Sequence, residues 1–373
     1  MSWLINILYY VVPFLVLLGV LVFVHEFGHY LIAKLCGVKV AEFSIGFGRT
    51  LWGQRDASGT LWKLSAIPLG GYCRFLGDGD ASSSTDAQEE LSPEEQKYAF
   101  ANQNPYKKLA IVIGGPAFNY LFAILVFFLI FATLGKMDFP PIIGEVMPDS
   151  AAQAAGIASG DRVLSVDGVK VNSFQQFRLE IDMNTTGVVQ LELQRGDELL
   201  HKKVHLKPVT DKDGNITEKP MVGVTSVNVV EFDRTAMSLW GAAKESVAET
   251  WRITATTLRG VYQMVTGARG TEELGGIVRI AEMSGDISKS NSIVDFLVFM
   301  ALLSINLGLI NLFPIPVLDG GHVVIFTIEI LLRREINEKA KEYVFKFGFA
   351  LLIALMFFAT YNDITHLIKR AFS

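Results

Sequence analysis

Two histidines and a glutamate stand inside an apolar stretch of the chain, "LLGVLVFVHEFGHYLIAKLCG" at residues 18–38. On an α-helix, His25 and His29 lie one turn apart on the same face, so both imidazoles can reach one metal ion. Glu26 follows the first of these ligands and can contact a water molecule at that metal. In this HExxH arrangement, zinc takes the two histidines and the glutamate acts as general base. The alternative, that these residues merely cap the end of a membrane span, is disfavoured because ionisable groups inside membranes usually serve a function.

A catalytic zinc ion needs a third protein ligand and one open coordination position. Asp319 is the first candidate, because it stands beside two prolines and two glycines in the apolar segment "NLFPIPVLDGGH" at 311–322. A turn or a helix cap at Asp319 is the alternative role, and His322 is the next candidate ligand. We expect His201 and His205, which alternate on one predicted strand, to be ordinary surface residues.

The composition is too apolar for an ordinary soluble protein and too charged for a chain that lies wholly in the membrane. The 373 residues are 50% hydrophobic and 19% charged, with a formal net charge of −5. This charge gives no electrostatic sign of nucleic-acid binding. Cys36 and Cys73 lack the CxxC spacing, so neither a disulfide framework nor a zinc knuckle is indicated.

Apolar runs with few charges predict about four transmembrane helices. The runs cover residues 4–24, 109–134, 296–318 and 343–362, and the last of them contains one lysine. A further apolar piece at 323–332 is too short to span a bilayer, and we expect it to lie against the helix bundle.

Lysine and arginine residues are concentrated after the first run and between the third and fourth runs. The positive-inside rule therefore places both segments in the cytoplasm, and the active site near the cytoplasmic face. Both termini and the long insert at 135–292 are then external. Lys369 and Arg370 near the C-terminus mildly contradict this orientation.

Segments between the apolar runs read as β-structure. Residues 40–76 are aromatic and glycine-rich and predict two strands around a polar turn at 55–60. Residues 135–208 contain short alternating strands, a small helical piece and turns at Asp167-Gly168 and Arg195-Gly196-Asp197. From about 235 to 266 the pattern becomes helical.

Two distant motifs together resemble the site-2 protease family of intramembrane zinc metalloproteases: HEFGH at 25–29 and N-x-x-P-x-P-x-L-D-G-G at 311–321. "GGPAFN" at 114–119 matches the family's glycine-proline-asparagine element in the second core span. "LSAIPLGGYCRF" at 64–75 is similar to its membrane-re-entrant β-hairpin, and "GIASGDRVLSVDG" at 156–168 is similar to a PDZ domain. The resemblance covers nearly the whole chain and points to the bacterial branch exemplified by the regulator of sigma-E protease, here with a single PDZ domain.

This resemblance implies an α-helical polytopic membrane protein with a membrane-associated β-hairpin and an inserted α/β PDZ domain. Residues 1–134 are expected to hold the first two transmembrane helices, the HExxH motif and the hairpin. The PDZ domain is expected at 135–208, and an external linker with amphipathic helices at 209–292. Residues 293–373 are expected to hold the last two transmembrane helices.

The same resemblance implies a zinc enzyme of the bacterial inner membrane that cleaves single-span membrane proteins within or near their transmembrane segments. An anti-sigma factor and remnant signal peptides are the implied substrates, and the PDZ domain would take peptide tails. Asn311, Pro314 and Pro316 are predicted to position an unwound substrate. The alternative role for Asn311 is to satisfy backbone groups that the two prolines leave free.

Two other classes of protein remain as alternatives. A non-catalytic membrane scaffold with a PDZ domain would lack a metal ligand or the base, yet all four candidates are present. A zinc protease of the type that processes prenylated C-termini also has HExxH, but it would need a glutamate ligand on a further helix and more spans. Metal analysis of an Asp319→Ala variant separates these alternatives.

Overall fold

The computed structural model describes residues 2–77, 91–135, 140–207, 221–226, 237–267, 275–290 and 292–372. The chain divides into two compact units. The first unit is mainly helical and comprises residues 1–130, 240–258 and 271–373. The second, inserted unit comprises residues 131–239 and 259–270.

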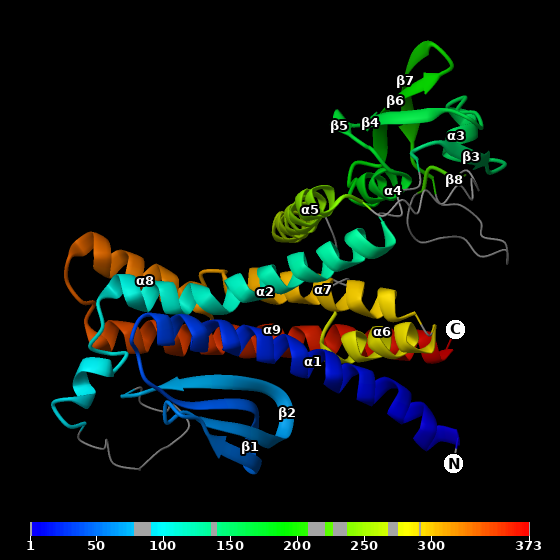
Figure 1. Ribbon diagram of the computed structural model, residues 1–373. Helices are drawn as coiled ribbons and strands as arrows, with labels where there is room; N and C mark the ends of the chain where they lie inside the picture. Colours follow the sequence, from blue (N-terminus) through cyan, green and yellow to red (C-terminus); the bar gives the residue numbers. More distant parts are fainter. Residues whose placement is uncertain are drawn as a thin grey trace. The chain divides into compact units, whose positions relative to one another are not determined.

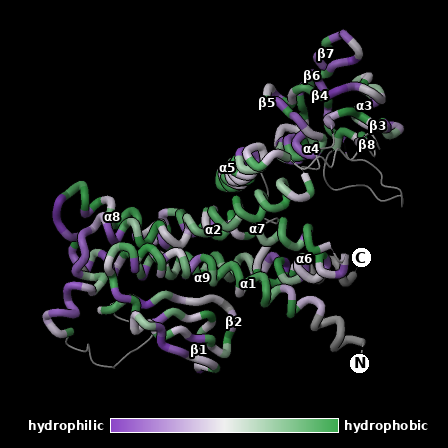
Figure 2. The backbone as a smooth tube through the Cα atoms, viewed as in Figure 1, coloured by the Kyte–Doolittle hydropathy of each residue, from purple (hydrophilic) through white to green (hydrophobic). Residues whose placement is uncertain are grey.

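Four helices in the described part of the chain are long and apolar enough to cross a membrane (Figure 1). They are α1 (Ser2–Leu35), α2 (Pro105–Leu134), α7 (Ile293–Asn311) and α9 (Glu338–Phe372). Figure 2 shows that hydrophobic residues dominate along these helices. An α-helix satisfies all its backbone hydrogen bonds internally, as a segment in hydrocarbon must. The predicted polytopic helical fold with about four transmembrane helices is confirmed.

The third of these helices ends before the apolar run that predicted it does. The apolar run extends to residue 318, but α7 ends at Asn311. Pro314 and Pro316 lack an amide hydrogen and restrict the residues before them, so the helix cannot continue through this segment. The chain turns here, and α8 (Asp319–Leu332) begins. With 14 residues, α8 is too short to be a span, as expected.

The predicted hairpin is present as β1 (Val40–Arg55) and β2 (Leu61–Phe75), which pair antiparallel. Its strands pair in two registers, because Phe43 lies opposite both Trp62 and Cys73. The first half of β1 therefore lies between the two halves of β2, and the hairpin folds back into a small sheet of four short segments. The two outer pairs run antiparallel, while the inner pair, 42–45 and 61–64, runs parallel. Residues 71–75 form one outer segment of this small sheet.

The turn of the hairpin is fixed against the end of α1 by the Asp56 carboxylate. It accepts hydrogen bonds from the Tyr30 hydroxyl at 2.9 Å, the Trp62 indole at 3.1 Å and the Ser58 amide at 2.8 Å. The Lys34 ammonium group donates to the Ser58 hydroxyl at 2.5 Å. The hairpin is thus held to the same helix that carries the HExxH motif.

The inserted unit is built around a four-stranded antiparallel sheet with the order β5-β4-β6-β7. These strands are β4 (Arg162–Val166), β5 (Val169–Lys170), β6 (Val188–Arg195) and β7 (Glu198–His205). Two helices accompany them, α3 (Ala151–Ala154) and α4 (Phe174–Asp182). A second pair of strands, β3 (Ile143–Val146) and β8 (Val224–Ser226), completes the unit.

One apolar core joins the strands and helices of the inserted unit, including Ile143, Val163, Phe177, Leu191 and Val222. This strand and helix content agrees with the inserted α/β PDZ domain that the sequence predicted. Val222 and β8 come from beyond residue 208, so the folded unit uses more of the chain than the predicted segment 135–208.

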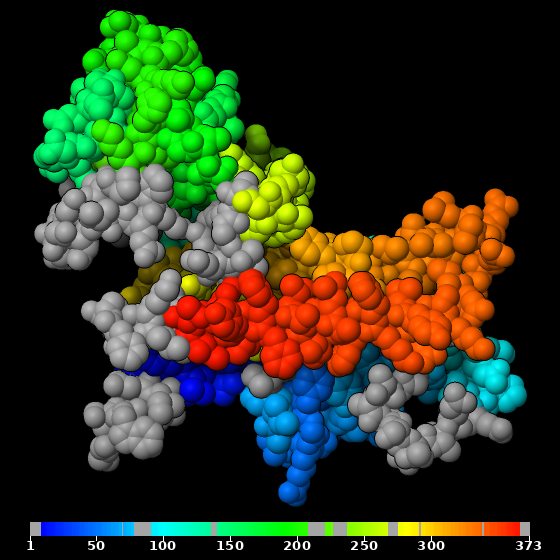
Figure 3. All heavy atoms as spheres, turned by 180° about the vertical axis from the view of Figure 1, so that it is seen from behind, coloured from blue at the N-terminus to red at the C-terminus, as the bar shows by residue number. Residues whose placement is uncertain are grey.

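The remaining described helices lie in the segments that connect the spanning helices. A 3₁₀ turn, η1 (Glu95–Tyr98), precedes α2, and α5 (Leu239–Val265) and α6 (Ile277–Lys289) precede α7. Asp363 of α9 caps the start of α6, accepting from the backbone amides of Gly276 and Val278 at 2.8 and 3.1 Å. Figure 3 shows α9 along the rear face of the helical unit, where its exposed side chains include Phe347 and Phe357.

Candidate metal centre

Three side chains from distant parts of the sequence meet inside the helical unit. His25 and His29 of α1 are each only 8% exposed, and Asp319 is the first residue of α8. The two Nε2 atoms lie 3.3 Å apart. The Asp319 carboxylate lies 3.2 Å from Nε2 of His25 and 3.5 Å from Nε2 of His29. Within the described ranges, these three residues are the one group of histidine, cysteine or acidic side chains that could hold a metal ion together.

The spacing of this cluster fits a tetrahedral zinc ion. Ligands about 2.0–2.1 Å from such an ion lie about 3.3 Å from one another, which matches the 3.2–3.5 Å separations here. Oδ2 of Asp319 is also one of four buried side-chain atoms, among the described residues, that lack a hydrogen-bond partner. Acceptor atoms that face one another in a buried site repel unless a cation lies between them.

The break after α7 places Asp319 beside the two histidines. The two glycines that follow it allow the first turn of α8 to lie against the backbone of the proline segment. A Cβ atom at Gly320 would collide with the carbonyls of Leu312 and Phe313, and one at Gly321 with Ile315. The prolines and glycines around Asp319 therefore form the tight turn from which the carboxylate reaches α1.

Helix α2 contacts the other side of the histidine pair. Nδ1 of His29 lies 2.9 Å from the backbone carbonyl oxygen of Ile111, to which it donates. A Cβ atom at Gly115 would collide with the His29 imidazole, so only glycine leaves room for the ring. Gly28 and Gly114 face each other where α1 and α2 approach most closely, because a Cβ at either position would meet the other's backbone carbonyl.

Asn119 of α2 is a neighbour of the cluster that the sequence analysis did not assign. Its side-chain amide lies 3.0 Å from Nδ1 of His25, and the residue is completely buried. The sequence feature that pointed to Asn119 was the motif "GGPAFN", which ends with this asparagine. The motif was recognised, but no role could be given to Asn119 until the structure placed it opposite His25.

Glu26 lies between the histidine pair and the hairpin. Its carboxylate accepts a hydrogen bond from the backbone amide of Cys73, in the outer segment of β2. A Cβ atom at Gly71 would lie 3.4 Å from Cγ of Glu26, so β2 passes close to this side chain. The structure thus places the Glu26 carboxylate next to His25 in the sequence and against the backbone amide of Cys73.

Comparison with known families agrees with this arrangement. The model of "Peptidase family M50", the site-2 protease family, matches residues 13–355 of the chain. The chain belongs to peptidase family M50. All of the residues in the metal cluster lie within the matched region.

Three relatives of this M50 protein each carry the name "Putative zinc metalloprotease". The relative from Agrobacterium fabrum is 40% identical and covers 96% of each chain. The relative from Rhizobium meliloti is 37% identical, and the match covers 98% of this chain and 100% of the relative. The relative from Mesorhizobium japonicum is 40% identical, and the match covers 95% of this chain and 98% of the relative. The M50 protein is a membrane zinc metalloprotease.

A solved structure, the PDZ domain of the SdrC-like protein from Listeria monocytogenes, covers 25% of this chain and 90% of its own, with 26% identity and a TM-score of 0.20.

The other residues singled out in the M50 sequence lie at different distances from the cluster. The Asn311 amide is 3.3 Å from Nε2 of His25. Pro316 packs against Gly348 of α9, and Pro314 is exposed. His322 contacts the rings of Phe326 and Phe345 and does not join the cluster.

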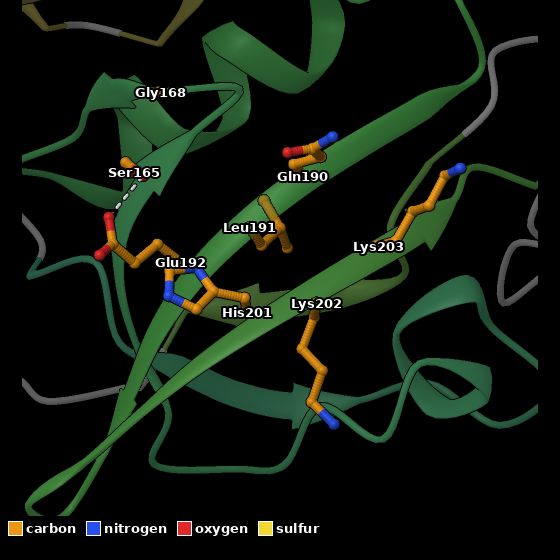
Figure 4. Close-up of a pocket in the computed structure, with 8 residues that line it drawn as sticks. All are labelled: Ser165, Gly168, Gln190, Leu191, Glu192, His201, Lys202 and Lys203. Carbon is orange, nitrogen blue, oxygen red and sulfur yellow. Dashed lines mark hydrogen bonds between the residues drawn. The ribbon is translucent and has the colours of Figure 1, made fainter.

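A shallow pocket of about 370 Å³ lies in the inserted unit, on the sheet formed by β4, β6 and β7 (Figure 4). His201 and Glu192 line it, and Glu192 accepts a hydrogen bond from the Ser165 hydroxyl at 3.0 Å. His201 and His205 are both exposed, as expected of surface residues. None of the cluster residues lines this pocket.

Proposed function

We propose that this M50 protein hydrolyses a peptide bond within or near the transmembrane segment of single-span membrane proteins. His25, His29 and Asp319 would hold the zinc ion, and Glu26 would act as the general base. One observation carries the proposal: three ligand atoms meet at zinc-compatible spacing, beside a carboxylate, on helices of a membrane-spanning unit.

The proposed chemistry divides between the ion and the protein. When bound, zinc polarises the scissile carbonyl and lowers the pKa of a water molecule to about 7. Glu26 takes the proton from the attacking water and later returns it to the leaving amine. The Cys73 amide that donates to the Glu26 carboxylate would keep it oriented between these two transfers.

A substrate helix must unwind before attack, because its carbonyl groups are already hydrogen-bonded along the helix. The outer segment of β2, residues 71–75, offers an extended backbone next to Glu26. An unwound substrate can add to such a segment as a further strand. Asn311 lies close enough to His25 to donate a hydrogen bond to the substrate backbone there. We propose that Pro314 and Pro316 support this role by shaping the turn that follows Asn311.

We propose the bacterial inner membrane as the location, with an anti-sigma factor or remnant signal peptides as substrates and peptide tails as ligands of the PDZ domain. The lysine and arginine distribution supports external termini and an active site near the cytoplasmic face. A reporter fused after Arg334 should therefore behave as cytoplasmic, and one within residues 150–205 as external. Finding the second reporter in the cytoplasm would invert this orientation.

Metal analysis of purified variants tests the proposed site. Asp319→Ala should lower zinc occupancy and abolish cleavage of single-span substrates, because two ligands make an incomplete site. His322→Ala is a matched control, since it alters a histidine three residues away that packs among aromatic rings outside the cluster. Normal zinc binding by Asp319→Ala would transfer the ligand role to another residue and refute the proposed site.

A further inference from the structure

We infer that Asn119 is a positioning residue for the metal centre: its amide oxygen accepts the Nδ1 hydrogen of His25 and keeps Nε2 of that ring directed at the metal. The inference rests on the proposed role of His25 as a zinc ligand. It adds a contact from α2 to a site whose proposed ligands come from α1 and α8.

The position of Asn119 is fixed independently of its contact with His25. The residue has 0% exposure and lies within α2. Its backbone carbonyl accepts a hydrogen bond from the Ser304 hydroxyl of α7 at 2.9 Å. Gly308 of α7 packs against the Cβ atom of Asn119. The side chain therefore has little room to turn away from the His25 ring.

The chemistry of the ligand then determines which atom Asn119 must present. A neutral imidazole that binds a metal through Nε2 carries its hydrogen on Nδ1. Nδ1 of His25, 3.0 Å from the Asn119 amide, can then only donate. Only the amide oxygen can accept that hydrogen, so Oδ1 has to face the ring when the metal is bound.

In His29, the second proposed ligand, Nδ1 also donates a hydrogen bond, but to a different acceptor. Nδ1 of His29 donates to the Ile111 carbonyl, which leaves Nε2 free to bind. Both acceptors, Ile111 and Asn119, come from α2. In the structure, Nδ2 of Asn119 faces His25, while Oδ1 is buried without a hydrogen-bond partner. Which end of an amide faces a neighbour is assigned from the surrounding hydrogen bonds, and a half-turn exchanges the two atoms.

Two substitutions at one position separate an accepting from a donating role. Asn119→Leu has nearly the same size but no acceptor, and outer-shell partners of metal ligands typically contribute about 10- to 100-fold in metal affinity. We expect Asn119→Leu to weaken zinc binding by about that factor, measured by competition with a chelator. Asn119→Asp keeps only acceptor oxygens and should bind zinc at least as tightly as the parent protein.

A matched control is available on α7. Asn306 is also an asparagine of a membrane helix, and its amide oxygen accepts from the Thr257 hydroxyl at 3.2 Å, away from the cluster. Asn306→Leu should leave zinc affinity unchanged. Thermal unfolding of each variant in excess chelator reports whether the fold without zinc is intact, and Asn119→Ala replaces Asn119→Leu if the leucine does not fit.

The outcomes distinguish this inference from the proposed function. If His25→Ala retains zinc, the proposed ligand set fails. If His25→Ala loses zinc but Asn119→Leu and Asn119→Ala bind it as tightly as the parent protein, the positioning role alone is wrong. Loss of zinc affinity in Asn119→Asp equal to that in Asn119→Leu would also overturn it, because the amide would then act as a donor.

Discussion

At the scale of single residues, glycines decide how closely the helices approach around His29. Its imidazole is confined by the Ile111 carbonyl on one nitrogen and by the Gly115 backbone beside the ring. Gly28 and Gly114 bring α1 and α2 into direct backbone contact next to it. Small residues at helix crossings are a general means of close packing in membranes, and here the close packing also orients a proposed metal ligand.

Gly115→Ala should therefore disturb the metal site although glycine is not a ligand. The added methyl group would collide with the His29 ring, which must rotate away from Asp319. We expect zinc occupancy and peptidase activity to fall at least tenfold, measured by metal analysis and substrate cleavage.

Gly19→Ala is the control for this prediction, because a Cβ atom at Gly19 of α1 meets nothing within 4 Å. It should leave zinc and activity unchanged. Full zinc occupancy in Gly115→Ala would show that the ring has more freedom than the contact implies.

At the scale of elements, the sequence predicted the existence and type of the spans better than their ends. Hydropathy identifies an apolar run that extends to residue 318. It does not show where the helix ends, because Pro314 and Pro316 stop α7 at Asn311. The two strands of the hairpin and its polar turn were predictable from their aromatic and glycine-rich composition. The double register around Phe43 was not, because it depends on how the strands fold back on themselves.

The candidate site, too, could be predicted only in part from the sequence. HExxH spacing and the composition around Asp319 were sufficient to nominate the cluster that the structure brings together. Asn119 and the Cys73 amide could not be assigned a role, since both contacts depend on how α2 and β2 pack against α1. Strand β8, which pairs with β3, lies beyond the predicted segment 135–208.

The inserted unit contains an ion pair that predicts a pH dependence. Burial of Asp161 raises its pKa, but hydrogen bonds from Arg195 and from the Ala158 amide outweigh this and hold the pKa below its ordinary value. A group with a lowered pKa in the folded state contributes its full stability above the unfolded-state pKa, about 4. That contribution is lost as the pH falls through the lower, folded-state value.

Asp161→Asn should therefore destabilise the inserted unit by about 2 kcal/mol near pH 7, and the difference from the parent protein should shrink below about pH 4. Hydrogen exchange of β6 and β7 in the full-length protein measures this. Asp197→Asn, at the exposed β6–β7 turn, should change stability little at either pH. A deficit in Asp161→Asn that is the same at pH 3 and pH 7 would contradict the ionic origin.

At the scale of the whole molecule, every residue proposed for catalysis belongs to the helical unit, and none to the inserted unit. We therefore expect the inserted domain to control which substrates are cut rather than to take part in the reaction. It can capture a newly exposed substrate tail, or its bulk can exclude substrates that still carry a large external domain. We favour exclusion, because a single PDZ domain adds only modest affinity and exclusion needs no tight binding.

Replacing residues 140–226 by a flexible Gly/Ser bridge tests this expectation. The deletion includes β8, so that no strand of the domain is left unpaired. The shortened protein should retain zinc and cleave trimmed substrates, and it should also cut untrimmed substrates that the intact protein rejects. A shortened protein that folds and holds zinc but cannot cleave trimmed substrates would show that the domain recruits or activates.

The most direct test of the central claim is cleavage of purified single-span substrates by the parent protein and by Glu26→Gln, with zinc content measured on the same samples. Glutamine keeps the size and hydrogen bonding of Glu26 but cannot take up the proton. We predict that cleavage falls by about 10²- to 10⁴-fold while zinc content is unchanged. Substantial remaining cleavage would contradict the proposed base, and loss of zinc together with activity would show that Glu26 is structural.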